Sequence, residues 1–114
     1  MSECVFCKIA MGEIAARKVM EDDDIVVFYD IRPAAPVHLL VVPKRHIASL
    51  DACGDGDQAI LGKLMLAAAK AAGKVGLADG FRTVVNVGTI GGQEVFHLHI
   101  HVLGGPEPLG RLAG

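Results

Sequence analysis

The sequence has no hydrophobic run of transmembrane length and no N-terminal secretory pattern. Its first residues, Met1–Cys4, lack a basic region followed by an apolar stretch. We therefore expect a cytoplasmic protein that does not contact membranes.

An excess of charge of either sign is also missing. The 114 residues include 11 basic and 13 acidic side chains, and the formal net charge is −2. The largest basic cluster is the short run Lys44–His46. Nucleic-acid binding requires a basic surface that neutralises phosphates, so we expect no nucleic-acid partner.

Cysteine is scarce and odd in number, with three residues in the chain. A cytoplasmic protein keeps its thiols reduced, and an odd count argues against a disulfide framework. The chain is long enough for a single domain, which we place at residues 1–114. A domain of this size has a modest core, so a metal or a partner subunit could add to its stability.

Apolar periodicity and turn residues predict an α+β fold, in which an antiparallel sheet carries one long helix and a short N-terminal helix. Ser49 or Asp51 could cap a further short helix. The Gly88–Gly92 loop joins the last two strands, and residues Gly104–Gly114 form an extended C-terminal tail. The predicted strands are Lys18–Glu21, Ile25–Tyr29, Val37–Val42, Phe81–Val87 and Val95–Leu103, and the predicted helices are Cys7–Met11 and Asp57–Val75.

Three of the five histidines alternate with apolar residues in the run His97–Leu103. Side chains of a strand alternate between its faces, so His97, His99 and His101 are expected on one face, roughly 6.5 to 7 Å apart. Neighbouring rings at that spacing could share one substrate, or one could bind a metal beside another that does chemistry. The alternative is a solvated strand face that happens to be rich in histidine.

His38 lies in the middle of an apolar strand, where a lone histidine is more often a core residue with satisfied hydrogen bonds. Its importance rises because the segment Gly91-Gly92-Gln93-Glu94 lies just before the histidine run. Glycines allow a backbone to approach a phosphate, and exposed amides there can bind phosphate oxygens. A lone Gly-Gly pair is most often only a turn.

The third candidate site is the Cys4-Val5-Phe6-Cys7 motif. A C-x-x-C spacing suits a redox pair, a pair of metal ligands or two unremarkable thiols. Cys53 fits no ligand spacing.

Several stretches that span nearly the whole chain resemble one family of proteins. They are Phe6–Ile9, Phe28–Ile31, Ala35–His38, Val42–Ile47, Asn86, Gly91–Val95 and His97–Gly105. On these residues the chain resembles the histidine triad (HIT) family, and more closely its Hint-like branch of bacterial histidine triad nucleotide-binding proteins, which hydrolyse nucleoside phosphoramidates. The resemblance implies a HIT-like fold whose sheet continues across the two-fold axis of a homodimer.

The resemblance also implies roles for the candidate catalytic residues. His99 would attack the α-phosphorus of a purine nucleotide and form a covalent nucleotidyl-histidine intermediate, from which water releases AMP. His101 and His38 would flank the phosphate and assist proton transfer. Asn86 and the segment Gly92-Gln93-Glu94 would complete the phosphate cradle.

Further residues would bind the nucleoside. Asp30 would accept hydrogen bonds from the ribose hydroxyls. An apolar slot for the base would consist of Phe6, Ile9, Phe28 and Ile31. From composition alone, these four residues could equally be core residues.

The resemblance implies a structural zinc ion bound by Cys4, Cys7, His46 and His97. Four protein ligands leave no open coordination position, so the ion would not take part in the chemistry. It would tie the N-terminal segment to the sheet, and His97 would have a role separate from those of the other two triad histidines.

Two departures from the family pattern affect the substrate. Glu94 stands where well-known eukaryotic Hint proteins have serine, and an ionised carboxylate can only accept hydrogen bonds. The tail also lacks the arginine that commonly follows Gly104-Gly105. A dinucleoside polyphosphate or another nucleotidyl ester is therefore an alternative substrate, and a non-catalytic nucleotide-binding module is a third interpretation.

Overall fold

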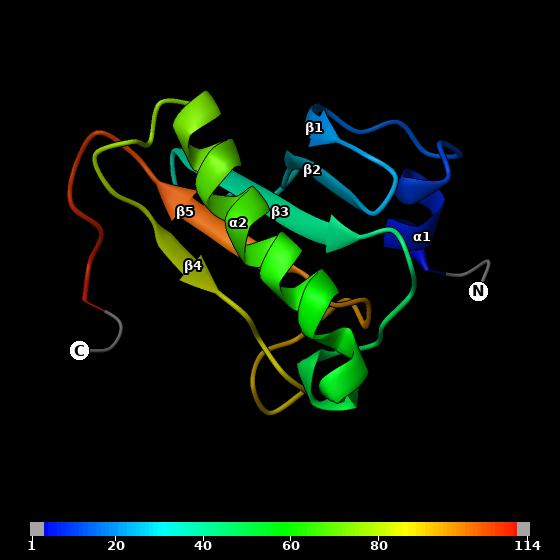
Figure 1. The fold of residues 1–114 in the computed structure, drawn as a ribbon. Helices are drawn as coiled ribbons and strands as arrows, with labels where there is room; N and C mark the ends of the chain where they lie inside the picture. Colours follow the sequence, from blue (N-terminus) through cyan, green and yellow to red (C-terminus); the bar gives the residue numbers. More distant parts are fainter. Residues whose placement is uncertain (1–3, 112–114) are drawn as a thin grey trace.

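The structure, a computed structural model, describes residues 4–111 and contains a long helix packed on an antiparallel sheet (Figure 1). The predicted α+β fold is confirmed. The elements, in chain order, are α1 (Val5–Ala10), β1 (Lys18–Glu21), β2 (Ile25–Tyr29), β3 (Val37–Pro43), two short 3-10 turns (Leu50–Ala52 and Asp55–Asp57), α2 (Gln58–Lys74), β4 (Arg82–Val84) and β5 (Ile100–Gly104). Within residues 4–111, no helix is both long and apolar enough to cross a membrane.

The strands of the described chain form one sheet in the order β1-β2-β3-β5-β4. β5 therefore lies between β3 and β4, although it is the last strand in the sequence. Its register with β3 pairs His38 with Leu103 and Leu40 with His101. His38 and His101 are diagonal neighbours on the same face of the sheet, because side chains two residues apart share a face.

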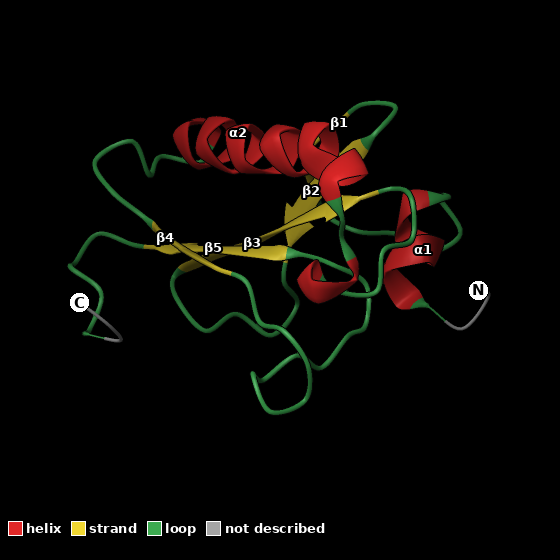
Figure 2. Ribbon diagram, turned by 60° about the horizontal axis from the view of Figure 1, so that its bottom comes forward, coloured by secondary structure: helices red, strands yellow, loops and turns green. Residues whose placement is uncertain are grey.

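Apolar side chains are buried on both faces of this sheet. Helix α2 packs on one face, over alternate residues that include Leu39 and Val41. The other face buries a second cluster of Phe6, Ile9, Val26, Phe28, Leu40 and Val42. Figure 2 shows α2 lying along one face, with α1 beside the β1–β2 end of the sheet. The histidines of β3 and β5 therefore lie on the face opposite α2.

The continuous apolar runs of β2 and β3 follow from burial on both faces, since neither face has to be polar. The predicted bounds of β1 and β2 are confirmed, and β3 extends one residue further, to Pro43. The long helix lies one residue inside each of its predicted ends, which are its N-cap Asp57 and its C-cap Val75.

Helix α1 begins two residues earlier than predicted and ends at Ala10. The reason is a cysteine cap: Cys4 Sγ accepts a hydrogen bond from the Cys7 amide at 3.4 Å. Cysteine is outside the usual set of N-capping residues, so this helix start could not be predicted from the residue type. The predicted short helix after Ser49 forms as a 3-10 turn. The Ser49 hydroxyl donates to the Asp51 carboxylate, and its oxygen does not accept from an amide of the turn as a capping oxygen would.

The predicted strand over Val95–Leu103 was wrong in its first half, because β5 begins only at Ile100. The ladder with β3 ends at the pair Val41–Ile100. Two pairs further along, Leu98 would face Pro43, which has no amide hydrogen to donate to a ladder. Leu98 instead donates its amide hydrogen to the Ile47 carbonyl at 2.6 Å.

The three triad histidines therefore do not share one strand face, and only His101 lies on β5. The strand predicted over Phe81–Val87 is likewise shorter, at Arg82–Val84. Beyond β5, the described part of the tail, residues 105–111, has no helix or strand. Its Gly110 carbonyl accepts a hydrogen bond from the Arg82 guanidinium, and residues 112–114 lie outside the described range.

Candidate functional site

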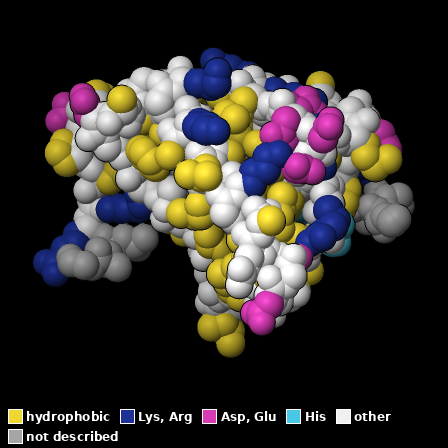
Figure 3. Space-filling model, in the orientation of Figure 1, with side chains coloured by type: hydrophobic (Ala, Val, Ile, Leu, Met, Phe, Trp, Pro, Cys, Tyr) yellow, Lys and Arg dark blue, Asp and Glu magenta, His cyan; other side chains and the backbone are white. Residues whose placement is uncertain are grey.

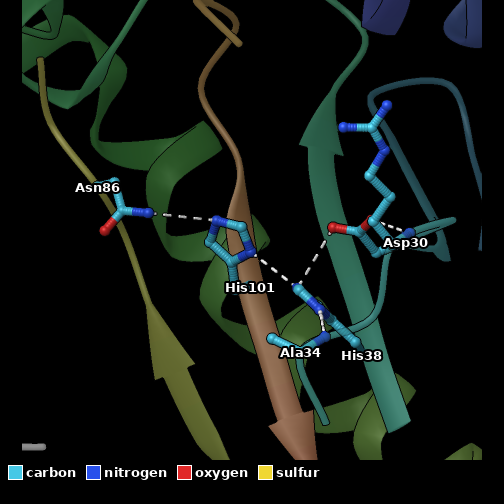
Figure 4. Close-up of polar contacts among 6 residues, drawn as sticks. Asp30, Ala34, His38, Asn86 and His101 are labelled. Carbon is cyan, nitrogen blue, oxygen red and sulfur yellow. Dashed lines mark hydrogen bonds and ion pairs between the residues drawn. The ribbon is translucent and has the colours of Figure 1, made fainter. Parts of the chain in front are cut away.

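A hydrogen-bonded histidine pair links β3 and β5 (Figure 4). His38 Nδ1 lies 2.9 Å from the Ala34 amide nitrogen, and an amide can only donate. The neutral imidazole of His38 must therefore carry its hydrogen on Nε2. Since His38 Nε2 is 2.9 Å from His101 Nδ1, the hydrogen bond runs from His38 to His101.

This hydrogen bond also fixes the tautomer of His101. Its Nδ1 accepts, so its hydrogen is on Nε2, which lies 3.5 Å from the Asn86 side-chain nitrogen. Two donors cannot bond to each other. They can both donate to one acceptor placed between them, such as a phosphate oxygen.

His99 is the opposite tautomer to His38 and His101. Its Nδ1 lies 2.7 Å from the His97 carbonyl oxygen, so Nδ1 carries the hydrogen. The Nε2 atom of His99 keeps its lone pair, and the rings of His99 and His101 are 4.8 Å apart between centroids. A nucleophilic nitrogen therefore lies beside a ring that can donate a proton.

Burial keeps this histidine pair uncharged near neutral pH. It lowers the pKa of His101 to about 4, with His99 and His38 as further causes. Burial also lowers the pKa of His38, although the nearby Asp30 carboxylate opposes this shift. The 3.4 Å contact between His38 Nε2 and Asp30 Oδ2 is thus not an ion pair at pH 7, because the His38 ring is neutral there.

A second cluster joins α1 to the segments that follow β3 and precede β5. The ligand atoms of Cys4, Cys7, His46 and His97 all lie within 4.8 Å of one another. The His97 Nδ1 atom is 3.3 Å from Cys4 Sγ, 3.5 Å from Cys7 Sγ and 3.2 Å from His46 Nδ1. In a tetrahedral zinc site with bonds of about 2.0 to 2.3 Å, neighbouring ligand atoms are roughly 3.3 to 3.8 Å apart.

The tautomer of His97 suits a metal ligand. Its Nε2 atom lies 2.7 Å from the Pro43 carbonyl oxygen, so Nε2 carries the hydrogen and Nδ1 presents a lone pair to the cluster. Burial lowers the pKa of His97 and so favours the neutral ring. Burial and the neighbouring Cys4 thiol raise the pKa of Cys7, so a cation at this cluster would favour the Cys7 thiolate. The residues present therefore fit a zinc ion.

Asp30, His38 and His101 also lie close enough to hold a metal, with ligand atoms within 4.8 Å of one another. Their hydrogen bonds argue against a metal ion at this cluster. A metal on His38 Nε2 would require the ring hydrogen to move to Nδ1, where it would face the donating Ala34 amide. The hydrogen bonds of this cluster instead form a chain from the Ala34 amide through His38 to His101.

The glycine-rich loop before the histidines is a tight turn. Gly88 and Gly92 have φ values of +72° and +93°, which favour glycine. A Cβ on Gly91 would lie 2.2 Å from the Val87 carbonyl oxygen. The amides of Gly92 and Gln93 donate to Thr89 and Gly88 within the turn, so in this structure they are not free to bind a phosphate as expected.

Gln93 is 4 % exposed, and its side chain fastens the loop to the rest of the chain. Oε1 accepts from the Gly88 amide at 2.9 Å, and Nε2 donates to the carbonyls of Ala48 and Val95. This use of the side chain differs from the expected contact with substrate. The neighbouring Glu94 is exposed.

The residues expected around the nucleoside do not all come together. Phe6, Ile9 and Phe28 are buried in one cluster. Ile31 is 92 % exposed and lies outside that cluster, in the turn after β2. Asp30 is half-buried beside His38, and its Oδ1 accepts from the amide of the turn residue Arg32.

Sequence reasoning missed three groups that act on the histidines. Two belong to the backbone, the Ala34 amide and the Pro43 carbonyl, and backbone groups leave no signature in a sequence. The third is the ring of Phe6, whose centroid is 5.1 Å from that of His99. The apolar position of Phe6 gave no sign of this contact.

Known proteins match this chain over most of its length. The family model of the HIT domain matches residues 11–107. Protein HitA of Neisseria gonorrhoeae is 54% identical over 106 residues, which cover 93% of this chain and 99% of that protein.

Solved structures agree in fold as well as in sequence. A HIT family hydrolase from Legionella pneumophila is 50% identical with a TM-score of 0.88, and the match covers 91% of this chain and 94% of that one. A HIT family hydrolase from Clostridium thermocellum is 40% identical with a TM-score of 0.94, and the match covers 99% of both chains.

Proposed function

Because the chain belongs to the HIT domain family, we propose that it is a nucleotide-binding hydrolase that cleaves the P–N bond of purine nucleoside phosphoramidates and releases AMP. One observation carries the proposal. The hydrogen bonds of the site leave a lone pair on His99 Nε2. They also place the ring hydrogen of the neighbouring His101 on its Nε2 atom, from which it can be donated. A nucleophile next to a proton donor is what a two-step transfer of a nucleotidyl group requires.

In the first step, His99 Nε2 attacks the α-phosphorus and the P–N bond breaks. The bond's electron pair leaves with the amine, which needs one proton. The bound phosphate anion raises the pKa of the His38–His101 pair, so the pair takes up a proton with the substrate and His101 Nε2 delivers it to the amine. The products are a free amine, a neutral histidine pair and a nucleotide bonded to His99.

In the second step, water attacks the same phosphorus. His101 Nε2 accepts a proton from the water, the bond between phosphorus and His99 Nε2 breaks, and AMP leaves. The His97 carbonyl holds His99 Nδ1–H throughout, so the same nitrogen atom is presented in each cycle. The Asn86 amide donates to a phosphate oxygen in both steps. Asp30 leaves His38 to accept from the ribose hydroxyls.

The base binds against the aromatic and aliphatic surface that begins at Phe6, Ile9 and Phe28, with Ile31 closing over it from the exposed turn. Gly92, Gln93 and Glu94 contribute through the position of their loop. Zinc at Cys4, Cys7, His46 and His97 would supply folding energy and no open coordination position, so no step of the reaction runs through it.

The proposal includes a homodimer in which the sheet continues across a two-fold axis. β4 is an outer strand of only three residues, so its free edge is available to a second copy. Apolar side chains gather on the outer side of α2 (Figure 3), where Met65 and Leu66 are 52 % and 64 % exposed. Burying such surface suits a chain whose own core is small.

The test is the release of AMP from adenosine 5′-phosphoramidate by the purified protein and by the folded variant His99→Asn. We expect turnover by the parent and its loss in the variant. No AMP from the parent would reject the phosphoramidase assignment, whereas turnover of a dinucleoside polyphosphate in its place would retain the nucleophile with a different leaving group.

A further inference from the structure

We propose that Phe6 is a positioning residue for His99, so that helix α1 sets the orientation of the attacking imidazole. The inference rests on the proposed function, in which His99 is the nucleophile. It goes beyond the nucleoside contact expected of Phe6, because it gives this side chain a part in the chemical step.

The first support is geometric. The rings of Phe6 and His99 are 5.1 Å apart between centroids and perpendicular, with an interplanar angle of 89°. This edge-to-face arrangement is one of the preferred geometries of aromatic pairs. Phe6 is 7 % exposed, so its ring is confined by the cluster around it.

The second support is that His99 has few other restraints. Among the residues that the structure describes, its single hydrogen bond runs from Nδ1 to the His97 carbonyl. One hydrogen bond does not fix the tilt of the imidazole, which is 7 % exposed and whose tilt is limited by the neighbouring rings of Phe6 and His101. His99 also precedes β5, so no ladder hydrogen bonds hold its backbone as they hold His101.

The third support is the place of Phe6 on α1. It lies between Cys4 and Cys7 in the sequence, and its ring also meets His97 edge-on at 6.0 Å. Phe6 therefore touches a proposed metal ligand and the proposed nucleophile from a helix that carries two further ligands. The position of helix α1 can therefore affect His99 through two contacts. One is the ring of Phe6, and the other is the carbonyl of His97.

Phe28 offers a matched control. It is buried in the same cluster at 3 % exposure, and its ring pairs with Phe6 at 5.6 Å. Among the described residues, its aromatic contacts include no histidine. If both phenylalanines serve only the base, their loss should affect catalysis in the same way.

The experiment compares Phe6→Leu with Phe28→Leu in the zinc-loaded protein. We expect Phe28→Leu to raise KM with little change in kcat. We expect Phe6→Leu to lower kcat about 10- to 100-fold, because a small misplacement of a reacting group costs about that much. Phe6→Tyr, which keeps the ring, should restore most of kcat.

A second readout needs no turnover. In nitrogen-15 NMR spectra, the imidazole signals that vanish in His99→Asn report the tautomer of His99. We expect a single Nδ1–H form in the parent and in Phe28→Leu, and a mixture of the two tautomers in Phe6→Leu. Phe6→Met takes the place of Phe6→Leu if that variant fails to bind zinc or to unfold cooperatively.

An unchanged His99 signal in Phe6→Leu, together with a rise in KM alone, would overturn the proposal and leave Phe6 as a wall of the base site. A protein that cleaves no phosphoramidate but shows the tautomer change would separate the two claims. The proposed function would then fail while the positioning of His99 by Phe6 would stand.

Discussion

At the scale of single residues, main-chain groups give chemically identical side chains different roles. His38 accepts from an amide, whereas His97 and His99 each donate to a carbonyl. Because of these three hydrogen bonds, His97 Nδ1 presents a lone pair to the cysteines and His99 Nε2 keeps its lone pair. The hydrogen of His38 lies on Nε2 and is donated to His101. The backbone thus sets the tautomer of each of these histidines, and the proposed roles of the histidines follow from their tautomers.

The same residues predict how stability depends on pH. The pKa of His101 is lowered to about 4 by burial, whereas the unfolded chain has the ordinary value near 6.5. Below pH 6.5 the unfolded state binds a proton that the folded state does not, so the free energy of unfolding falls as pH decreases toward 4. The lowered pKa of His38 acts in the same direction.

Urea unfolding of the parent and of His101→Asn at several pH values measures this effect. Both proteins keep the cysteine and histidine ligands, so acid loss of metal is common to them. We expect the parent to lose about 1 to 2 kcal/mol more than the variant, a figure reduced for the partial exposure of the ring. Equal slopes for the two proteins would contradict the assignment of a neutral His101.

At the scale of elements, the turn before the histidines is held by Gln93. Its side chain bonds to Gly88, Ala48 and Val95 while almost fully buried. Gln93→Leu would leave these three backbone groups without partners, at a cost of about 1 to 3 kcal/mol for each buried group.

We therefore expect Gln93→Leu to lower the free energy of unfolding by more than about 2 kcal/mol, measured by urea denaturation. The exposed neighbour Glu94 provides the control, since Glu94→Gln should change stability by less than about 0.5 kcal/mol. A change in KM with unchanged stability in Gln93→Leu would instead support direct contact with substrate.

Helix α1 gives a second prediction at this scale. Protein purified without chelator should contain one zinc ion per chain, and Cys7→Ser should lose it. If free zinc is about 1,000 times the dissociation constant, the ion adds about 4 kcal/mol to stability.

Cys53→Ser serves as the control, because Cys53 lies outside the cluster. Elemental analysis and thermal unfolding with and without chelator measure the effect. The melting temperature of the parent and of Cys53→Ser should fall on chelation, and that of Cys7→Ser should not. Well under one zinc per chain in the parent would refute the metal site.

The elements also show where sequence reasoning succeeds. The apolar periodicity of α2 and the β-branched run of β2 depend on local residues, and both elements lie where they were predicted, to within a residue. The start of β5 depends on Pro43, which is far away in the sequence and ends the ladder that the histidine run would have joined. The start of α1 depends on an unusual cysteine cap.

For the candidate site, the sequence predicted which residues belong to the clusters, and the structure showed how their side chains are arranged. The resemblance to the HIT family implied that Cys4, Cys7, His46 and His97 form one group, and these ligand atoms do converge. The reason for expecting the triad on one strand face was wrong. The ring orientations come from backbone carbonyls and amides, which no residue pattern encodes.

At the scale of the whole molecule, the open edge of β4 predicts a dimer. Sedimentation equilibrium should give twice the chain mass of 11.9 kDa. Thr83 is the central residue of β4, so Thr83→Pro, which removes an amide hydrogen from this outer strand, should weaken the dimer. Thr83→Val keeps the amide and should remain dimeric. A single-chain mass for the parent at all concentrations would contradict the prediction.

The central claim is that His99 becomes covalently bonded to the nucleotide during turnover. The most direct measurement is the intact mass of the chain after rapid acid-free quenching with adenosine 5′-phosphoramidate, followed by localisation of the added group. We expect one adenylyl group per chain, on His99 Nε2, and none on the folded variant His99→Asn. Steady turnover in which the chain never gains this mass, or an adenylyl group on another residue, would contradict it.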